Sequence, residues 1–184
     1  MPEKIKDRRY CRTQRLLEEA LIRLLKKKNI HEISIYEITE EADISRATFY
    51  LHYKSPHELL LALEKKLLEE IIAAYKVHDV SDPAEFLLTL YTYVQTHHEL
   101  LLLLLHPETG SGFWEKMSRA VRKEHFCLWA DPLSQLTEKE RAYIGVFVIE
   151  GYISVIKEWL LGGMQETPQE MVALSGRLQY KILP

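Results

Sequence analysis

The most informative stretch of this chain is residues 34–58, SIYEITEEADISRATFYLHYKSPHE. Ser34 and Glu37 have the spacing of a capping box, in which each side chain bonds the other residue's backbone amide, so they predict the start of a helix. Asp43 favours a turn and tolerates left-handed backbone geometry, and Ser45 then provides the cap of a second helix. Two short helices joined by such a turn are typical of a helix-turn-helix, whose second helix enters the major groove of DNA.

The second helix of this motif has polar and aromatic side chains where a core would need leucine or valine. Phe49 and Tyr53 lie four residues apart and are expected to point together into a core. Ala47 is small, which would let this helix cross its neighbour closely. The other faces carry Arg46, Thr48, Tyr50 and His52. This pattern favours a DNA-reading helix over the alternative, an ordinary helical hairpin with a solvated face.

Charge is distributed unevenly along the chain, although its net value is only -3. Residues 1–60 carry 12 Lys or Arg against 10 Asp or Glu, whereas residues 61–184 carry 12 against 17. The basic residues of the N-terminal arm are Lys4, Lys6, Arg8, Arg9, Arg12 and Arg15. A basic arm beside a helix-turn-helix is suited to phosphate contact, and the alternative for its first two lysines is a solvated tail.

The composition is that of a globular protein of one or two small domains. The chain has 184 residues, 47% hydrophobic and 28% charged, which is enough for a buried core. Cys11 and Cys127 are too few for a disulfide framework and suit a reducing cytoplasm. The first 15 residues lack the apolar core of a secretory signal, and the longest apolar run, Leu100 to Leu105, is far shorter than the roughly 20 residues of a membrane span. We therefore expect a cytoplasmic protein without a membrane partner.

Almost the whole chain has the pattern of α-helix, and no alternation of Val, Ile and Thr indicates a sheet. Ser55, Asp82 and Thr167 are each followed by proline and, three residues after the cap, by glutamate, which marks a helix start. We expect an all-α fold of about nine helices, over residues 8–28, 35–42, 46–52, 56–78, 83–97, 98–106, 112–128, 138–161 and 168–181. Residues 1–54 would form a helix-turn-helix domain, and residues 55–184 a helical ligand-binding and dimerisation domain.

From Arg12 to Leu60 the chain resembles the DNA-binding domain of the TetR family of bacterial regulators. Arg12–Leu25 fits the family's first helix, Ile35–Ala42 its second, and Ser45–Ser55 its recognition helix with the step into helix four. The resemblance implies that the DNA-contacting residues are Arg12, Thr13, Ser34, Ser45, Arg46, Thr48, Tyr50, His52 and Lys54. Arg46 and Thr48 would meet base edges, because arginine is the commonest reader of guanine. The phosphate contacts would come from Thr13, Ser34, Tyr50, His52 and Lys54, and these set register rather than sequence.

Two positions depart from the family pattern. The family usually has glycine in the turn, where this chain has Asp43, a residue that can adopt the same backbone region. The family often has a phosphate-contacting lysine where this chain has Pro56, so one backbone contact is missing. Lys54 or His57 could replace it.

The C-terminal part carries a second resemblance. Phe113–Lys116, Gly151–Leu160 and Gly163–Pro168 are similar to one subtype of regulatory domain in this family. The same subtype occurs in activators that resemble the dihydroxyacetone-kinase operon regulator. The resemblance implies a transcriptional regulator that responds to an effector and is more often a repressor.

No pattern in the sequence supports catalysis, a cofactor or a metal site. The chain has no phosphate-cradling glycine loop and no nucleophile elbow. Adjacent carboxylates such as Glu18 and Glu19 are expected on solvated helix faces. His97, His98 and His106 are close in sequence, but no cysteine joins them at zinc-ligand spacing.

The segment Tyr143–Ile149 is apolar on nearly every side of its predicted helix, so it must be covered all round. We expect a second copy of the chain as the cover, with the last two helices of each copy forming a four-helix interface. The predicted interface residues are Phe147, Ile149, Tyr152, Ile156, Trp159, Leu174 and Leu178. The alternative is a hairpin buried within one chain. A two-fold dimer would carry two reading heads roughly 34–36 Å apart and match a palindromic operator.

Aromatic residues are frequent in the central helices, and a bundle of this kind often keeps a cavity. The candidate wall of an effector site is Phe86, Tyr91, Phe113, Trp114 and Trp129, although aromatics at helical spacing more often form core. An effector in the bundle would tilt helix four and release DNA. Two alternatives remain open: the effector is a protein partner that docks on the C-terminal domain and needs no small-molecule pocket, or the chain is a helical scaffold that has lost DNA binding.

Overall fold

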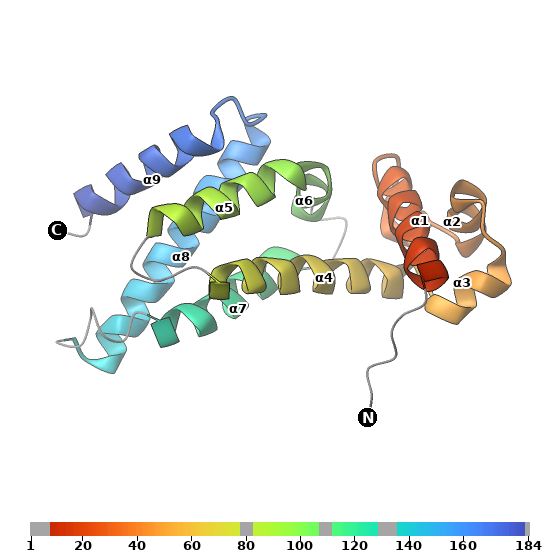
Figure 1. The fold of residues 1–184 in the computed structure, drawn as a ribbon, viewed down its shortest axis with the longest axis horizontal. Helices are drawn as coiled ribbons and strands as arrows, with labels where there is room; N and C mark the ends of the chain where they lie inside the picture. Colours follow the sequence, from red (N-terminus) through yellow and green to blue (C-terminus); the bar gives the residue numbers. More distant parts are fainter. Residues whose placement is uncertain (1–7, 78–82, 107–111, 129–135, 183–184) are drawn as a thin grey trace. The chain divides into compact units, whose positions relative to one another are not determined.

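The computed structural model describes residues 8–77, 83–106, 112–128 and 136–182, and in these ranges the chain is all-α (Figure 1). Nine α-helices and one short 3-10 helix account for the described secondary structure. The chain divides into two compact units, and the division falls inside α4, after Lys66. The predicted domain boundary between residues 54 and 55 lies just before α4 and stays a prediction.

The first unit contains a helix-turn-helix and the helices that support it. Its elements are α1 (Arg8–Leu25), η1 (Ile30–Glu32), α2 (Ile35–Ala42), α3 (Arg46–His52) and the beginning of α4 (Pro56–Val77). Helix α2 packs against both α1 and α3. The fully buried side chains at the centre of this unit are Leu17, Ala20, Leu21, Ile38, Phe49, Leu59 and Leu60. The apolar positions of four different helices therefore meet in one core.

Helix α1 ends earlier than predicted. The backbone N–H groups of Lys27 and Lys28 both donate to the carbonyl of Leu24, at 2.9 and 3.1 Å, and this tightens and closes the last turn. The chain then forms η1, which was not predicted, and places Ile30 and Ile33 in the core. Burying these two isoleucines requires a change of direction that a helix continued to residue 28 would not allow.

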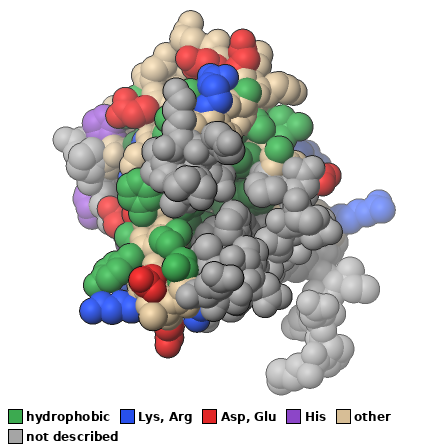
Figure 2. All heavy atoms as spheres, turned by 90° about the vertical axis from the view of Figure 1, so that its left-hand side faces the viewer, with side chains coloured by type: hydrophobic (Ala, Val, Ile, Leu, Met, Phe, Trp, Pro, Cys, Tyr) green, Lys and Arg blue, Asp and Glu red, His purple; other side chains and the backbone are tan. Residues whose placement is uncertain are grey.

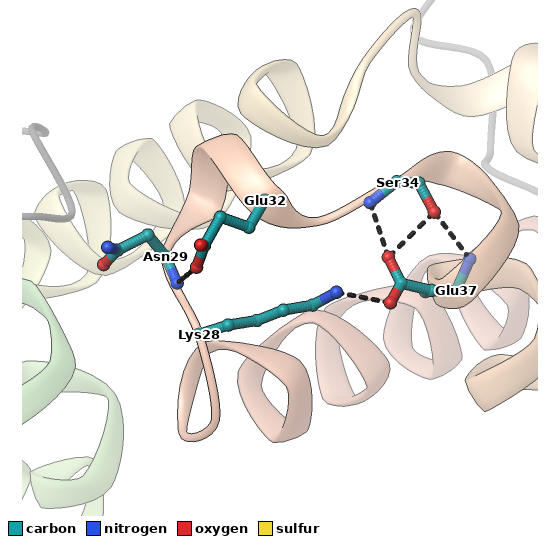
Figure 3. A network of polar contacts seen from close by, with 5 residues as sticks. All are labelled: Lys28, Asn29, Glu32, Ser34 and Glu37. Carbon is teal, nitrogen blue, oxygen red and sulfur yellow. Dashed lines mark hydrogen bonds and ion pairs between the residues drawn. The ribbon is translucent and has the colours of Figure 1, made fainter.

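Helix α2 begins at the predicted capping box (Figure 3). The Glu37 backbone amide donates to Ser34 Oγ at 3.3 Å, and the Ser34 amide donates to Glu37 Oε2 at 3.0 Å. Lys28 also pairs with the Glu37 carboxylate, from the segment that links α1 to η1. The Lys28 hydrogen bond and then the Ser34 bonds lower the pKa of Glu37 to about 2, because both favour its charged form.

The second unit contains the rest of α4 together with α5 (Pro83–Thr96), α6 (His98–Leu105), α7 (Phe113–Leu128), α8 (Glu138–Leu161) and α9 (Pro168–Ile182). Helix α7 packs along α8, and α5 packs along α9, as Figure 1 shows. Capping boxes at Thr137 and Thr167 open α8 and α9, whereas Asp82 lies outside the described residues. Helix α8 ends at Leu161 before Gly162 and Gly163, and Gly163 has a left-handed φ of 78°, a common way for a helix to end.

One buried polar contact joins α5 to α9. The hydroxyls of Tyr91 and Ser175 lie 2.6 Å apart, and both side chains are almost completely inaccessible to solvent. The Tyr91 ring also meets the Trp159 ring edge-on, with 5.4 Å between centroids. The indole N–H of Trp159 donates to the Glu166 carbonyl at 3.2 Å. These contacts fix α9 against the interior of the unit.

No described helix is both long and apolar enough to cross a lipid bilayer. No cluster of three or more His, Cys, Asp or Glu side chains suited to a metal ion occurs among the described residues.

Candidate nucleic-acid interface

The turn between α2 and α3 has the geometry that a helix-turn-helix requires. Asp43 adopts φ 52° and ψ 49°, the left-handed region, and ends α2. The Ile44 amide then donates to the Thr39 carbonyl at 2.9 Å. Ser45 caps α3 by accepting the Thr48 amide at 3.1 Å. Aspartate is therefore sufficient at the position where a glycine is usual.

Helix α3 has one buried and one exposed face. Phe49 is fully buried and Tyr53 nearly so, which confirms the prediction that both point into the core. The exposed face is made of Arg46, Ala47, Tyr50 and Leu51, spaced one turn apart in two pairs. The prediction for Ala47 was wrong. Its side chain lies on the exposed side of α3 and not at a helix crossing.

Arg46 contacts a neighbour, Tyr36, that was not among the predicted site residues. Its guanidinium carbon lies 5.0 Å from the centroid of the Tyr36 ring, within the range of a cation–π contact. Tyr36 is the second residue of α2 and is 52% exposed, so this contact lies at the surface. An exposed aromatic residue on the otherwise polar side of α2 was the only sign of it in the sequence.

Two of the predicted DNA contacts lie partly inside the unit. The Thr48 hydroxyl is 2.8 Å from Ser45 Oγ, and the Thr48 side chain is half-buried. The His52 ring stacks on Tyr10 of α1, with 4.0 Å between centroids and 24° between planes. Contacts of Thr48 and His52 with DNA stay predictions, and these side chains are placed less favourably for them than Arg46.

The other predicted contacts are spread around the motif. Arg12, Ser34 and Lys54 are exposed, and Thr13 is half-buried. Arg8 and Arg9 are exposed at the start of α1, whereas Lys4 and Lys6 lie outside the described residues. Pro56 opens α4, and Lys54 and His57, the candidates to replace the missing lysine, are both exposed. Contacts of these residues with DNA stay predictions.

A buried acidic residue supports the motif from within. Glu18 is only 5% exposed, so the expectation of a solvated face was wrong for this residue. Its carboxylate accepts from Lys66 Nζ and from Gln14 Nε2, each at 2.9 Å. Burial, and then the charge of Glu18, raise the pKa of Tyr53. A buried carboxylate needs such partners, and this one joins α1 to α4.

The candidate effector wall lies largely in the core of the second unit. Tyr91, Phe113 and Trp114 are buried, whereas Phe86 is half-buried and Trp129 lies outside the described residues. The indole N–H of Trp114 has no hydrogen-bond partner among the described residues. Lys157 Nζ lies 5.3 Å from the centroid of the Trp114 ring. An unpaired buried donor is uncommon and calls for an explanation.

The predicted interface residues fall into three groups. Phe147 is 58% exposed and Leu178 39%, Tyr152 and Leu174 are half-buried, and Ile149, Ile156 and Trp159 are buried within their own unit. Tyr143 and Val146, at 64% and 40% exposure, extend the exposed apolar surface of α8 beyond the predicted set. Figure 2 views the second unit from the side on which α8 begins, and hydrophobic side chains reach the surface there beside charged ones.

Two families match the chain. Residues 17–63 match the family described as bacterial regulatory proteins of the tetR family. Residues 81–180, more than half of the chain, match a TetR-type family described as a transcriptional regulator C-terminal region.

Two relatives match parts of the chain. The HTH-type dhaKLM operon transcriptional activator DhaS of Lactococcus lactis subsp. lactis (strain IL1403) is 29% identical over 127 residues, 67% of this chain and 60% of the relative. An uncharacterized HTH-type transcriptional regulator, YxbF, of Bacillus subtilis (strain 168) is 39% identical over 85 residues, 46% of this chain and 22% of the relative. The matches therefore span less than two thirds of the length of either relative.

Solved structures share the fold across nearly the whole chain. A transcriptional regulator of the TerR/AcrR family from Aquifex aeolicus VF5 has a TM-score of 0.70, with 16% identity over 93% of this chain and 99% of that one. The dihydroxyacetone kinase operon activator DhaS has a TM-score of 0.64, also with 16% identity, over 93% and 96%. At such low identity these likenesses concern the fold alone.

Proposed function

The chain belongs to the TetR family of bacterial transcriptional regulators and has a helix-turn-helix DNA-binding domain, and from that premise we propose that it binds a palindromic operator as a homodimer. In this proposal it represses transcription until an effector reaches the C-terminal domain, residues 55–184. It works in the cytoplasm, where its DNA is. The observation that carries the proposal is the exposed face of α3, which has an arginine at its N-terminal end and no role in the core.

The exposed face of α3 has the chemistry of a base reader. Arg46 can donate two hydrogen bonds to O6 and N7 of guanine, the commonest specific contact in the major groove. The first unit also has exposed cations that suit contacts with DNA phosphates: Arg8, Arg9, Arg12 and Lys54. The second unit is net acidic, so positive charge that favours DNA lies in the N-terminal part of the chain.

A test of this function is selection of bound fragments from random duplex DNA by the full chain. We expect an enriched sequence with inverted symmetry, and half-sites separated by about one helical turn, 10–10.5 base pairs. Enrichment of no sequence, or of a single half-site without symmetry, would contradict the proposal.

The proposed dimer rests on apolar side chains that one copy leaves uncovered. Tyr143, Val146 and Phe147 are spaced at three and four residues on α8, so they form one continuous exposed face. Exposed apolar patches of this kind commonly mark protein interfaces. Leu178 adds an exposed apolar side chain on α9. Ile149, Ile156 and Trp159 would support this interface from inside the unit.

The proposed effector site rests on Trp114. Its buried N–H lacks a partner among the described residues, and Lys157 lies over its ring. A small molecule with a hydrogen-bond acceptor, such as a carboxylate, would satisfy that donor next to a positive charge. The test is a screen of small carboxylates for release of a labelled operator, in which a Trp114→Phe variant binds the operator but no longer responds.

A second candidate is a regulator whose effector is a protein. The exposed face of α8 favours this candidate, because a protein partner could bind there instead of a second copy of the chain. The relative DhaS is named as an activator, so activation is the corresponding outcome here. The mass of the purified chain in solution separates the two candidates: a dimer uses the face itself, and a monomer leaves it free for a partner.

A further inference from the structure

Leu51 is the most exposed of the large hydrophobic side chains of the described chain, at 79%. A single exposed leucine is common and needs no explanation by itself. The position of this one is more informative, because it follows Tyr50 and lies four residues after Ala47 on the exposed face of α3. Two apolar side chains therefore lie beside Arg46 and Tyr50 on the exposed part of α3.

Leu51 contributes nothing to the core of its unit. The neighbouring positions Phe49 and Tyr53 point inward and fill the interior, and their side chains are 0% and 7% exposed. A side chain left almost fully in water gains no burial on folding, so a polar residue would serve the fold equally well. The apolar side chain of Leu51 is therefore available to a partner that covers it after folding.

The major groove offers one apolar group to such a side chain. Thymine presents its C5 methyl there, whereas cytosine has only hydrogen at the same carbon, and apolar side chains contact the methyl. Arg46 and Leu51 are five residues apart, which is about 7.5 Å along the helix axis at 1.5 Å per residue. This is about two base-pair steps of 3.4 Å, so the two residues would meet different base pairs of one half-site.

We propose that Leu51, with Ala47 beside it, contacts the C5 methyl of a thymine in each half-site, about two steps from the guanine that Arg46 reads. The inference deepens the proposed function and rests on it, since α3 must lie in the major groove. The occupant of this apolar surface is thus a thymine methyl in duplex DNA. Arg46 beside it supplies the charge that suits the same duplex.

The experiment replaces each thymine of the selected site, one at a time, with deoxyuridine, which lacks only the methyl group. Binding of the full chain is measured by fluorescence anisotropy at fixed salt. Removing one buried methyl should weaken wild-type binding about fourfold at one thymine per half-site. Leu51→Ala should bind the thymine and deoxyuridine sites with the same affinity at that position.

Leu61→Ala is the matched control, because Leu61 is an exposed leucine of α4, 40% exposed, outside the face of α3. It should keep the fourfold preference for thymine, and thermal unfolding should show that both variants fold like the wild type. If no deoxyuridine substitution weakens wild-type binding, or if Leu51→Ala keeps the preference, the inference is wrong while DNA binding stands. If the wild type selects no duplex at all, the proposed function itself fails.

Discussion

Tyr36 should set the affinity of the protein for its operator through Arg46, without touching the bases itself. Its ring lies 5.0 Å from the guanidinium carbon and therefore restricts where the arginine points before DNA arrives. Tyr36 is 52% exposed, so the contact belongs at the lower end of the cation–π scale, about 0.5–1 kcal/mol. Tyr36→Leu should therefore weaken operator binding about two- to fivefold.

Arg46→Ala removes the reader itself and should cost about 1–3 kcal/mol, which is about five- to 150-fold in Kd. It should also relax the preference for guanine at one position of each half-site. Tyr36→Phe keeps the aromatic face and should bind like the wild type, which makes it the matched control. In an Arg46→Ala background, Tyr36→Leu should have no further effect, because it has nothing left to orient.

The assay is fluorescence anisotropy with the selected site and with a site whose read guanine is changed. The reasoning is refuted if the losses from Tyr36→Leu and Arg46→Ala add in the double variant. It is also refuted if Tyr36→Phe weakens binding as much as Tyr36→Leu, since the hydroxyl would then be contacting DNA directly.

Three further predictions concern stability and assembly. Ser175→Ala leaves the buried Tyr91 hydroxyl unpaired and should cost about 1–3 kcal/mol in urea unfolding, a loss that Tyr91→Phe in the same chain largely restores; an unchanged midpoint would contradict this. The folded pKa of Glu37, about 2, lies below its ordinary value of 4.5, so its stabilisation is complete above about pH 4.5 and is lost as the pH falls toward 2. Glu37→Gln should flatten the pH dependence of the unfolding free energy in that window. A slope equal to that of the wild type would contradict a stabilising role of the Glu37 carboxylate. Phe147→Lys should turn the dimer into a folded monomer in sedimentation experiments, whereas Ala142→Lys, exposed on a different side of the same helix, should not.

The helices were predictable because their starts are marked locally. A cap and a glutamate three residues later depend only on neighbouring residues, so the patterns at Ser34 and Thr167 predicted the first residues of α2 and α9. The end of α1 was harder to predict, because it depends on where Ile30 and Ile33 find a core. Three lysines in succession gave no local stop signal.

The candidate site was predictable in type but not in orientation. Phe49 and Arg46 were placed correctly by helical spacing, as core and surface. The outward position of Ala47, the inward positions of Thr48 and His52 and the Tyr36 contact depend on how α1 and α2 lie beside α3. Such tertiary relations leave little trace in the local sequence.

Burial of Glu18 and Trp159 was missed for a related reason. Residues next to one another on a helix point to different sides, so Glu18 faces Lys66 while Glu19 is exposed. Helix α8 is apolar all round, and its periodicity alone does not show which side meets its own unit and which side is left for another chain. The packing of α7 along α8 and of Trp159 on Tyr91 distinguishes the two sides.

The most direct test of the account is the affinity of the full chain for its selected duplex against a scrambled duplex of the same composition, at physiological salt. If the exposed face of α3 reads bases, the wild type should prefer the selected duplex by a factor on the order of 10³ or more, and Arg46→Ala should lower that ratio about five- to 150-fold. Equal affinity of the wild type for both duplexes would contradict the account.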